Sequence, residues 1–144
     1  MQKESLIIGL LILTLLGLAT SLYLVYNHYY PRLQGGICDI TAAVSCTVVN
    51  SGIYSTIAGI PVAMYGVLWF LILGTFSWKS EQDKKAIPKL LGWNILGMVF
   101  VIYFIYIEYV LDTICPFCTV VHILVLLSLV LSILLYKQVG KNDH

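Results

Sequence analysis

The chain has 144 residues, of which 60% are hydrophobic and only 10% are charged. Soluble domains contain about 45–50% apolar and about 25% charged residues, so this composition excludes an ordinary soluble protein. The net charge of +1 leaves no basic surface to neutralise many phosphates, which excludes nucleic acid as a main partner.

Four apolar segments are long enough to cross a membrane as helices. Crossing a hydrocarbon core of about 30 Å takes about 20 mostly apolar residues. The segments are residues 6–26, 61–78, 90–111 and 117–136. Their apolar residues lie all around each helix, which is typical of contact with lipid. The sequence therefore predicts an all-α fold, a membrane four-helix bundle that forms a single domain over residues 1–144.

The first segment has an alternative interpretation as a cleaved signal peptide over residues 1–21. Lys3 precedes an apolar run in which small residues occur near position 20. The run continues to Val25, however, which is too long for the apolar region of a typical signal peptide. We therefore interpret this segment as a membrane-spanning helix.

The connection between the first two spans, about residues 27–59, is long for so small a protein. Loops longer than about 12–15 residues are usually functional when they are not disordered. Gly35 and Gly36 indicate a turn. Asp39 or Thr41 is then placed to cap a short helix.

This short helix is expected to run through Val49 and to end at Asn50, Ser51 and Gly52. Apolar residues follow it, which predicts that the rest of the connection lies against the membrane surface or over the mouth of the bundle as a lid. These residues are Ile53, Tyr54, Ile57 and Ile60.

Basic residues predict the orientation of the bundle. Seven of the eight Lys and Arg residues fall on the side that carries both termini: Lys3, Lys79, Lys84, Lys85, Lys89, Lys137 and Lys141. Only Arg32 falls on the other side. Cytoplasmic loops carry an excess of positive charge, so we expect a multi-pass protein of the plasma membrane with both termini in the cytoplasm.

All four cysteines fall on the predicted outer side or at its membrane edge: Cys38, Cys46, Cys115 and Cys118. Thiols outside the cytoplasm are kept oxidised, so this placement indicates disulfide chemistry. Cys115 and Cys118 form a C-x-x-C motif at the start of the last span, where residues three apart share one helical face. The positive end of the helix favours a thiolate, which lowers the pKa of Cys115 and makes the pair reactive.

Other interpretations of the cysteines remain open at this point. The four thiols could ligate zinc, but Cys38 and Cys46 are eight residues apart, unlike the close pairs of structural zinc sites, and we predict no metal. A disulfide between Cys38 and Cys46 could be purely structural. The C-x-x-C pair could also be inert.

Three further ionisable residues lie near the C-x-x-C motif. His122 follows Cys118 by four residues on the same helical face, where it could donate a hydrogen bond or a proton to a group beside Cys118. Pairing with a neighbouring helix is the alternative for His122. Glu108 and Asp112, near the outer end of the third span, could relay protons or serve interfacial or capping roles.

Three stretches together resemble the vitamin K epoxide reductase family of membrane thiol oxidoreductases. The first is Cys38-Asp39-Ile40 through Ser45-Cys46, the second is Gly59-Ile60-Pro61-Val62-Ala63-Met64-Tyr65-Gly66, and the third is Cys115-Pro116-Phe117-Cys118. Their order and the separation of the two loop cysteines match the family, and the resemblance spans nearly the whole chain.

The resemblance implies a four-helix bundle around a quinone of the menaquinone or ubiquinone type. Cys115 and Cys118 would be the redox centre, with Cys118 nearer the quinone. Cys38 and Cys46 would be shuttle cysteines on the outer loop. Two positions that contact the quinone oxygens in the family correspond to Ser55 and His122.

Animal members of the family have Asn and Tyr at these two positions, so the sequence is more similar to the prokaryotic branch. That branch oxidises a thioredoxin-like protein, often fused to the same chain. No such domain occurs in this sequence, so a separate dithiol protein on the outer side is implied. The predicted function is thiol:quinone oxidoreduction that supports disulfide-bond formation. The alternatives are a vitamin K epoxide or quinone reductase of animal type, and a non-enzymatic membrane scaffold with static disulfides.

Overall fold

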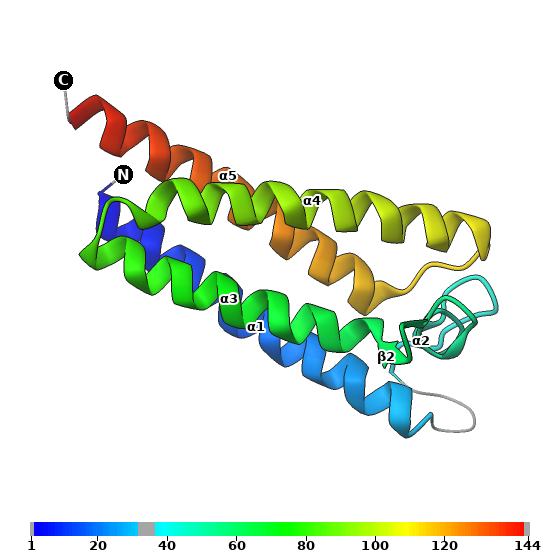
Figure 1. The fold of residues 1–144 in the computed structure, drawn as a ribbon. Coiled ribbons are helices and arrows are strands. Elements are labelled where there is room, and N and C mark those ends of the chain that lie inside the picture. Colours follow the sequence, from blue (N-terminus) through cyan, green and yellow to red (C-terminus); the bar gives the residue numbers. More distant parts are fainter. Residues whose placement is uncertain (1, 32–36, 143–144) are drawn as a thin grey trace.

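The computed structural model describes residues 2–31 and 37–142. Four long helices dominate it, and a short helix and two short strands lie between the first two of them (Figure 1). The long helices are α1 (Lys3–Tyr29), α3 (Val62–Gln82), α4 (Ala86–Val110) and α5 (Pro116–Asn142). The short elements are α2 (Cys46–Ser51), β1 (Thr56–Ile57) and β2 (Ile60–Pro61). The predicted all-α membrane bundle is confirmed. Arg32 and the Gly35–Gly36 turn lie outside the described residues.

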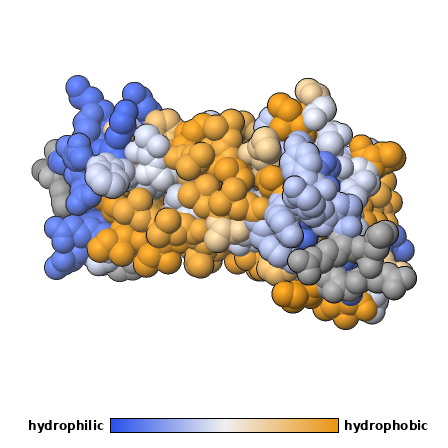
Figure 2. Space-filling view, turned by 90° about the horizontal axis from the view of Figure 1, so that it is seen from below, coloured by the Kyte–Doolittle hydropathy of each residue, from blue (hydrophilic) through white to orange (hydrophobic). Residues whose placement is uncertain are grey.

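Each of the four long helices is apolar enough to span a membrane. Their most apolar windows have mean hydropathies of 2.3, 1.4, 2.1 and 2.7 in chain order. An apolar band covers the middle of the bundle, and hydrophilic residues gather at one end (Figure 2). The helices α1 and α5 extend beyond both predicted ends of their spans because a helix can continue past the hydrocarbon into the polar interface.

The long helices pack in the cyclic order α1, α3, α4, α5, so that each contacts two neighbours. Large apolar side chains fill the centre, and the most deeply buried are Leu6, Leu10, Phe70, Leu73, Leu90 and Leu135. A Cβ atom at Gly17 of α1 would collide with the ring of Phe70 of α3. Small residues at such positions let membrane helices approach closely, which explains the glycine at position 17.

A buried polar network joins α4 to α5. The side-chain amide of Asn94 donates to the Oγ of Ser132 at 2.9 Å, and its Oδ1 accepts from the Oγ of Ser128 at 2.5 Å. All three side chains are fully buried. An unpaired amide in hydrocarbon would cost several kcal/mol. The hydrogen bonds among these three side chains remove that cost within the membrane.

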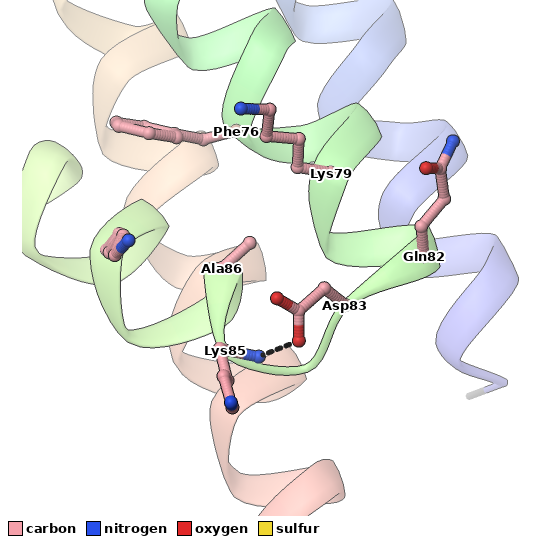
Figure 3. Close-up of a pocket in the computed structure, with 7 residues that line it drawn as sticks. Phe76, Lys79, Gln82, Asp83, Lys85 and Ala86 are labelled. Carbon is pink, nitrogen blue, oxygen red and sulfur yellow. Dashed lines mark hydrogen bonds between the residues drawn. The ribbon is translucent and has the colours of Figure 1, made fainter.

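The two ends of the bundle differ in chemistry. Both termini and the turn between α3 and α4 lie at one end, which we call the lysine end (Figure 1). A cavity of about 340 Å³ opens there, and Lys79 and Lys85 line it. Asp83 closes the turn by accepting a hydrogen bond from the backbone N–H of Lys85 at 2.9 Å (Figure 3). The four cysteines lie at the opposite end of the bundle, which we call the cysteine end.

The start of the short helix differs from the prediction. Its N-cap is Ser45, whose Oγ accepts from the backbone N–H of Val48 at 3.2 Å, and neither Asp39 nor Thr41 takes that position. The reason is a tight turn in which Thr41 and Val44 exchange backbone hydrogen bonds. That turn leaves the backbone extended up to Ser45, so the helix begins later. Its predicted end is confirmed, since α2 stops at Ser51 with Gly52 as its cap.

The hairpin of β1 and β2 follows α2 and was not predicted. Thr56 pairs with Pro61, and Ile57 pairs with Ile60. The two residues of the turn, Ala58 and Gly59, have φ angles of 53° and 78°. Tight two-residue hairpins need such positive φ angles, and Ala at the first position gives no signal for one.

Candidate redox site

Backbone pairing at the cysteine end brings two distant segments together. The N–H of Ser45 donates to the carbonyl of Ile114 at 3.0 Å, and the N–H of Ile114 donates to the carbonyl of Ala43 at 2.9 Å. Cys46 comes directly after the first of these segments and Cys115 directly after the second. This short parallel bridge therefore places the two cysteines side by side.

The four cysteines form two disulfides that contact each other. Cys38 pairs with Cys46, with Cα atoms 5.5 Å apart, and Cys115 pairs with Cys118, with Cα atoms 5.2 Å apart. The Sγ atoms of Cys46 and Cys115 are 3.3 Å apart, and both residues have no exposed surface. Thiol–disulfide exchange requires direct attack of one sulfur on another, and this contact permits it. Disulfide sulfurs offer no thiolate to a metal ion in this state.

The first turn of α5 is arranged to stabilise charge on sulfur. Pro116 begins the helix, where its missing N–H costs no hydrogen bond. The backbone N–H of Cys118 donates to the Sγ of Cys115 at 3.2 Å. A helix N-terminus carries partial positive charge, so a thiolate formed at Cys115 would be stabilised there.

Asp39 holds the loop between Cys38 and Cys46. Its carboxylate accepts from the hydroxyl of Ser45 at 2.6 Å and from the backbone N–H and hydroxyl of Thr47 at 3.0 and 2.6 Å. Burial works to raise the pKa of Asp39, but the hydrogen bonds from Ser45 and Thr47 outweigh it and hold the pKa below its ordinary value. Because Cys46 lies between its two partners, Asp39 fixes the position of that sulfur.

A cavity of about 490 Å³ opens beside the Cys115–Cys118 disulfide, inside the bundle. All four long helices and the lid contribute to its largely apolar wall. Its polar groups include the side chains of Ser21, Asn50, Ser55, Glu108, Cys118 and His122, the hydroxyls of Tyr54 and Tyr65, and the indole N–H groups of Trp69 and Trp93. Cys118 lies on this wall and Cys115 does not. The two sulfurs of the C-x-x-C motif therefore face different partners, Cys115 the loop cysteines and Cys118 the cavity.

The structure brings the other predicted site residues to this same cavity. Ser55 comes from the lid and is 6% exposed, while His122 comes from α5 and is 9% exposed. Two backbone hydrogen bonds fix Ser55. Its N–H donates to the carbonyl of Gly52 at 3.0 Å, and its carbonyl accepts from the N–H of Val62 at 2.8 Å. Tyr54, Ser55 and Ile57 lie on the wall, which agrees with the expectation of a lid. The contact roles of Ser55 and His122 stay predictions.

Two cavity residues were missed by sequence reasoning. Asn50 was predicted only as the end of the short helix, yet its amide donates to the carbonyl of Leu24 at 2.5 Å and ties α2 to α1. Trp69 lines the cavity, and its indole N–H has no acceptor among the described residues. Its ring stacks on that of Trp93 with centroids 6.3 Å apart. No sequence motif predicts that Trp69 lines the cavity, because its position there depends on how α3 packs against α4.

The two carboxyl groups near the motif occupy different environments. Glu108 is partly buried, lines the cavity and accepts a long hydrogen bond from the backbone N–H of Cys115 at 3.4 Å. Its carboxylate lies within 4.8 Å of the sulfurs of both Cys115 and Cys118. Asp112 is exposed, has a φ angle of 50° and does not line the cavity. Of these two carboxyl groups, only Glu108 therefore lies beside the sulfurs of the C-x-x-C motif.

A membrane bundle with two touching disulfides beside an apolar cavity defines the class of protein, a multi-pass membrane oxidoreductase acting on thiols. Comparison with family models identifies the particular family. The model described as the vitamin K epoxide reductase family matches residues 8–133, and the chain therefore belongs to that family. Its members are oxidoreductases linked to thiols and quinones. A search of curated proteins found no match.

Proposed function

We propose that this protein is a thiol:quinone oxidoreductase that supports disulfide-bond formation. Electrons would pass from a thioredoxin-like dithiol protein through Cys38 and Cys46 to Cys115 and Cys118, and then to a quinone. The observation that carries the proposal is the contact between the Sγ atoms of Cys46 and Cys115 at 3.3 Å, with Cys118 on the cavity wall.

The transfer between the two disulfides follows from this contact. The partner first reduces the Cys38–Cys46 disulfide through a mixed disulfide. The thiolate of Cys46 then attacks Cys115, a Cys46–Cys115 bond forms, and Cys118 leaves as a thiolate. Attack of Cys38 on Cys46 restores the first disulfide and releases Cys115. The net result is a reduced C-x-x-C pair and an oxidised partner.

Exposed apolar residues flank the entry point for the partner. Ile37 and Ile40 lie on either side of the Cys38–Asp39 pair and are 86% and 71% exposed, while Cys38 itself is 2% exposed. Such a rim gives a thioredoxin-like protein a surface to dock on before exchange. Because Cys38 is covered, we expect docking to displace part of this loop.

The cavity suits a quinone of the menaquinone or ubiquinone type. Its volume of about 490 Å³ falls in the usual range for small-molecule sites, about 300–1,000 Å³. A quinone ring is apolar and carries carbonyl oxygens that accept hydrogen bonds. The side chains of Ser55 and His122 and the indole N–H of Trp69, which has no acceptor among the described residues, are among the donors on its wall. When bound, a quinone supplies a two-electron acceptor next to Cys118.

The proposed orientation is that of a prokaryotic-type plasma-membrane protein. The lysine end would face the cytoplasm, because the described lysines lie at the start of α1, in or beside the turn between α3 and α4, and in the last two turns of α5. The cysteine end would face the outer side, where an oxidising compartment maintains disulfides and the dithiol partner resides. Two disulfides at that end support this assignment.

The test uses purified protein in detergent with a soluble quinone and two reductants, dithiothreitol and a reduced thioredoxin-like protein. Cys118→Ala should lose quinone reduction with both reductants, because it removes the electron exit. Cys46→Ala should keep the dithiothreitol-driven rate and lose the protein-driven rate. Turnover of Cys118→Ala at the parent rate, or equal losses for Cys46→Ala with both reductants, would contradict the proposed path.

A further inference from the structure

We infer that Glu108 carries the protons that accompany electron transfer from the Cys115–Cys118 pair to the cavity. This inference rests on the proposed function and deepens it, because it assigns a proton path to a site so far described only by its electron path. Glu108 comes from α4, whereas both sulfurs come from the start of α5. The bundle therefore brings an acid–base group to the sulfurs from a separate element.

The position of Glu108 links the two places between which protons must move. Its carboxylate lies within 4.8 Å of the Sγ atoms of Cys115 and Cys118. It also lines the cavity that Cys118, Ser55 and His122 line. A carboxyl group in a membrane-spanning helix is costly, and such groups usually serve a function. Among the described residues, Glu108 is the only carboxylate on the wall of this cavity.

The reaction requires such a carrier. The exchange releases Cys118 and Cys115 as thiolates, which take up the two protons that the partner's dithiol gives up. Oxidation of the reduced pair then breaks two S–H bonds and forms one S–S bond, so two electrons and two protons leave the sulfurs. Reduction of a quinone to a quinol consumes two electrons and two protons. Glu108 as a carboxylate accepts a proton from a thiol of the pair and, as a carboxylic acid, releases it toward the acceptor in the cavity. One carboxyl group holds one proton at a time, so it acts twice in each cycle.

The hydrogen bond from the Cys115 N–H does not by itself explain why position 108 carries a carboxyl group. At 3.4 Å the bond is long, and an amide side chain would accept it equally well. What glutamine lacks is a proton to exchange. The other titratable groups around the sulfurs and the cavity are His122 of α5, Tyr65 of α3 and Tyr54 of the lid.

The decisive variant is Glu108→Gln, which keeps the acceptor for the Cys115 N–H and removes the exchangeable proton. In reduced, quinone-free protein, we would follow the alkylation of Cys118 by iodoacetamide across a pH series, resolved by mass spectrometry. The parent profile should show the two apparent steps of a coupled carboxyl–thiol pair, and Glu108→Gln should show a single thiol step. Quinone reduction by the variant should fall about 100-fold or more, the usual effect of losing general acid–base catalysis.

Two controls separate proton transfer from folding. Asp112→Asn removes the exposed carboxylate at the same end of α4 and should leave the profile and the rate unchanged, because Asn tolerates the positive φ angle there. Glu108→Asp retains a carboxyl group and should restore the second step of the profile. Disulfide exchange between the loop cysteines and the C-x-x-C pair, measured without quinone, should persist in all three variants.

The outcomes distinguish this inference from the proposed function. Superimposable alkylation profiles for the parent and Glu108→Gln, or an undiminished rate of quinone reduction, would overturn the inference while leaving the function standing. A slower variant that keeps both steps of the profile would also overturn it, since the loss would then come from positioning. A parent protein that does not reduce quinone would overturn both.

Discussion

Asp39 shows how one charged side chain can set the geometry of the loop that carries Cys38 and Cys46. The carboxylate gathers the hydroxyls of Ser45 and Thr47 and one backbone N–H at the start of α2. These contacts are made with the charged form, which is why they lower the pKa of Asp39. The residue acts through Cys46, which lies between its partners, and does not itself touch the reacting bond.

We predict that Asp39→Asn lowers the rate with the protein reductant but not the rate with dithiothreitol. Loss of the charge-assisted hydrogen bonds should destabilise the loop by about 1–2 kcal/mol, because the site is partly exposed. Misplacing Cys46 should slow the protein-driven reaction about 10-fold or more. The dithiothreitol-driven reaction bypasses the loop and should not change. Equal slowing with both reductants would show that Asp39 serves the fold in general. Asp83→Asn, at the lysine end, is the matched control.

The same residue predicts a pH dependence with a defined sign. A carboxyl group whose pKa is lowered by folding stabilises the folded state above its unfolded pKa of about 4, and this contribution is lost as the pH falls through the lower folded value. The protein-driven rate of the parent should therefore stay constant as the pH falls to about 4 and decline only below it, as Asp39 becomes protonated. The Asp39→Asn variant should lack this acid-side decline, which stopped-flow rates over an acidic pH series would show.

At the scale of elements, glycines allow the close approach of α1 and α3, and the tightest contact is at Gly17. A Cβ atom at Gly17 would collide with the ring of Phe70, whereas a Cβ atom at Gly92 of α4 would meet nothing within 4 Å. Gly17→Ala should therefore destabilise the bundle by about 1–3 kcal/mol through overpacking. Gly92→Ala should be neutral or stabilise by up to about 1 kcal/mol, because alanine favours a helix. Thermal unfolding in detergent compares the pair, and equal stabilities would contradict the packing described for α1 and α3.

The long helices were predictable because lipid imposes a simple requirement, about 20 apolar residues with all backbone groups satisfied within the helix. The start of α2 was not, because Ser45 became the cap only when Val44 took an extended conformation beside Ile114. That pairing joins residues 70 positions apart along the chain, which no local pattern reveals. The hairpin after α2 depends on Ala58 in a conformation that alanine rarely adopts.

The candidate site also has features that the sequence predicts and features that it does not. The C-x-x-C motif, the loop cysteines and the four-residue spacing of Cys118 and His122 are visible in the sequence. The sequence does not reveal which sulfur meets which. The contact of Cys46 with Cys115, and the position of Cys118 on the cavity wall, arise from packing among segments far apart along the chain. Trp69 enters the site for the same reason.

At the scale of the whole molecule, the chemistry of the two ends predicts how the protein sits in its membrane. An impermeant maleimide applied to intact cells, after reduction, should label cysteines introduced at Ile37 or Ile53, which are 86% and 85% exposed at the cysteine end. Cysteines introduced at Lys84 or Lys141 should react only after the membrane is opened. The reverse pattern would place the native cysteines in the cytoplasm and contradict the proposed orientation.

Electrons are proposed to cross between the two disulfides by direct exchange between Cys46 and Cys115, and a trapped intermediate tests this exchange most directly. In the double variant Cys38→Ala and Cys118→Ala, each remaining cysteine has lost its native partner. Mild oxidation should then join Cys46 to Cys115 within one chain, because their sulfurs already lie 3.3 Å apart. Mass spectrometry of the digested protein should recover the two cysteine peptides as a linked pair. Recovery of free thiols, or of links between separate chains only, would contradict the relay.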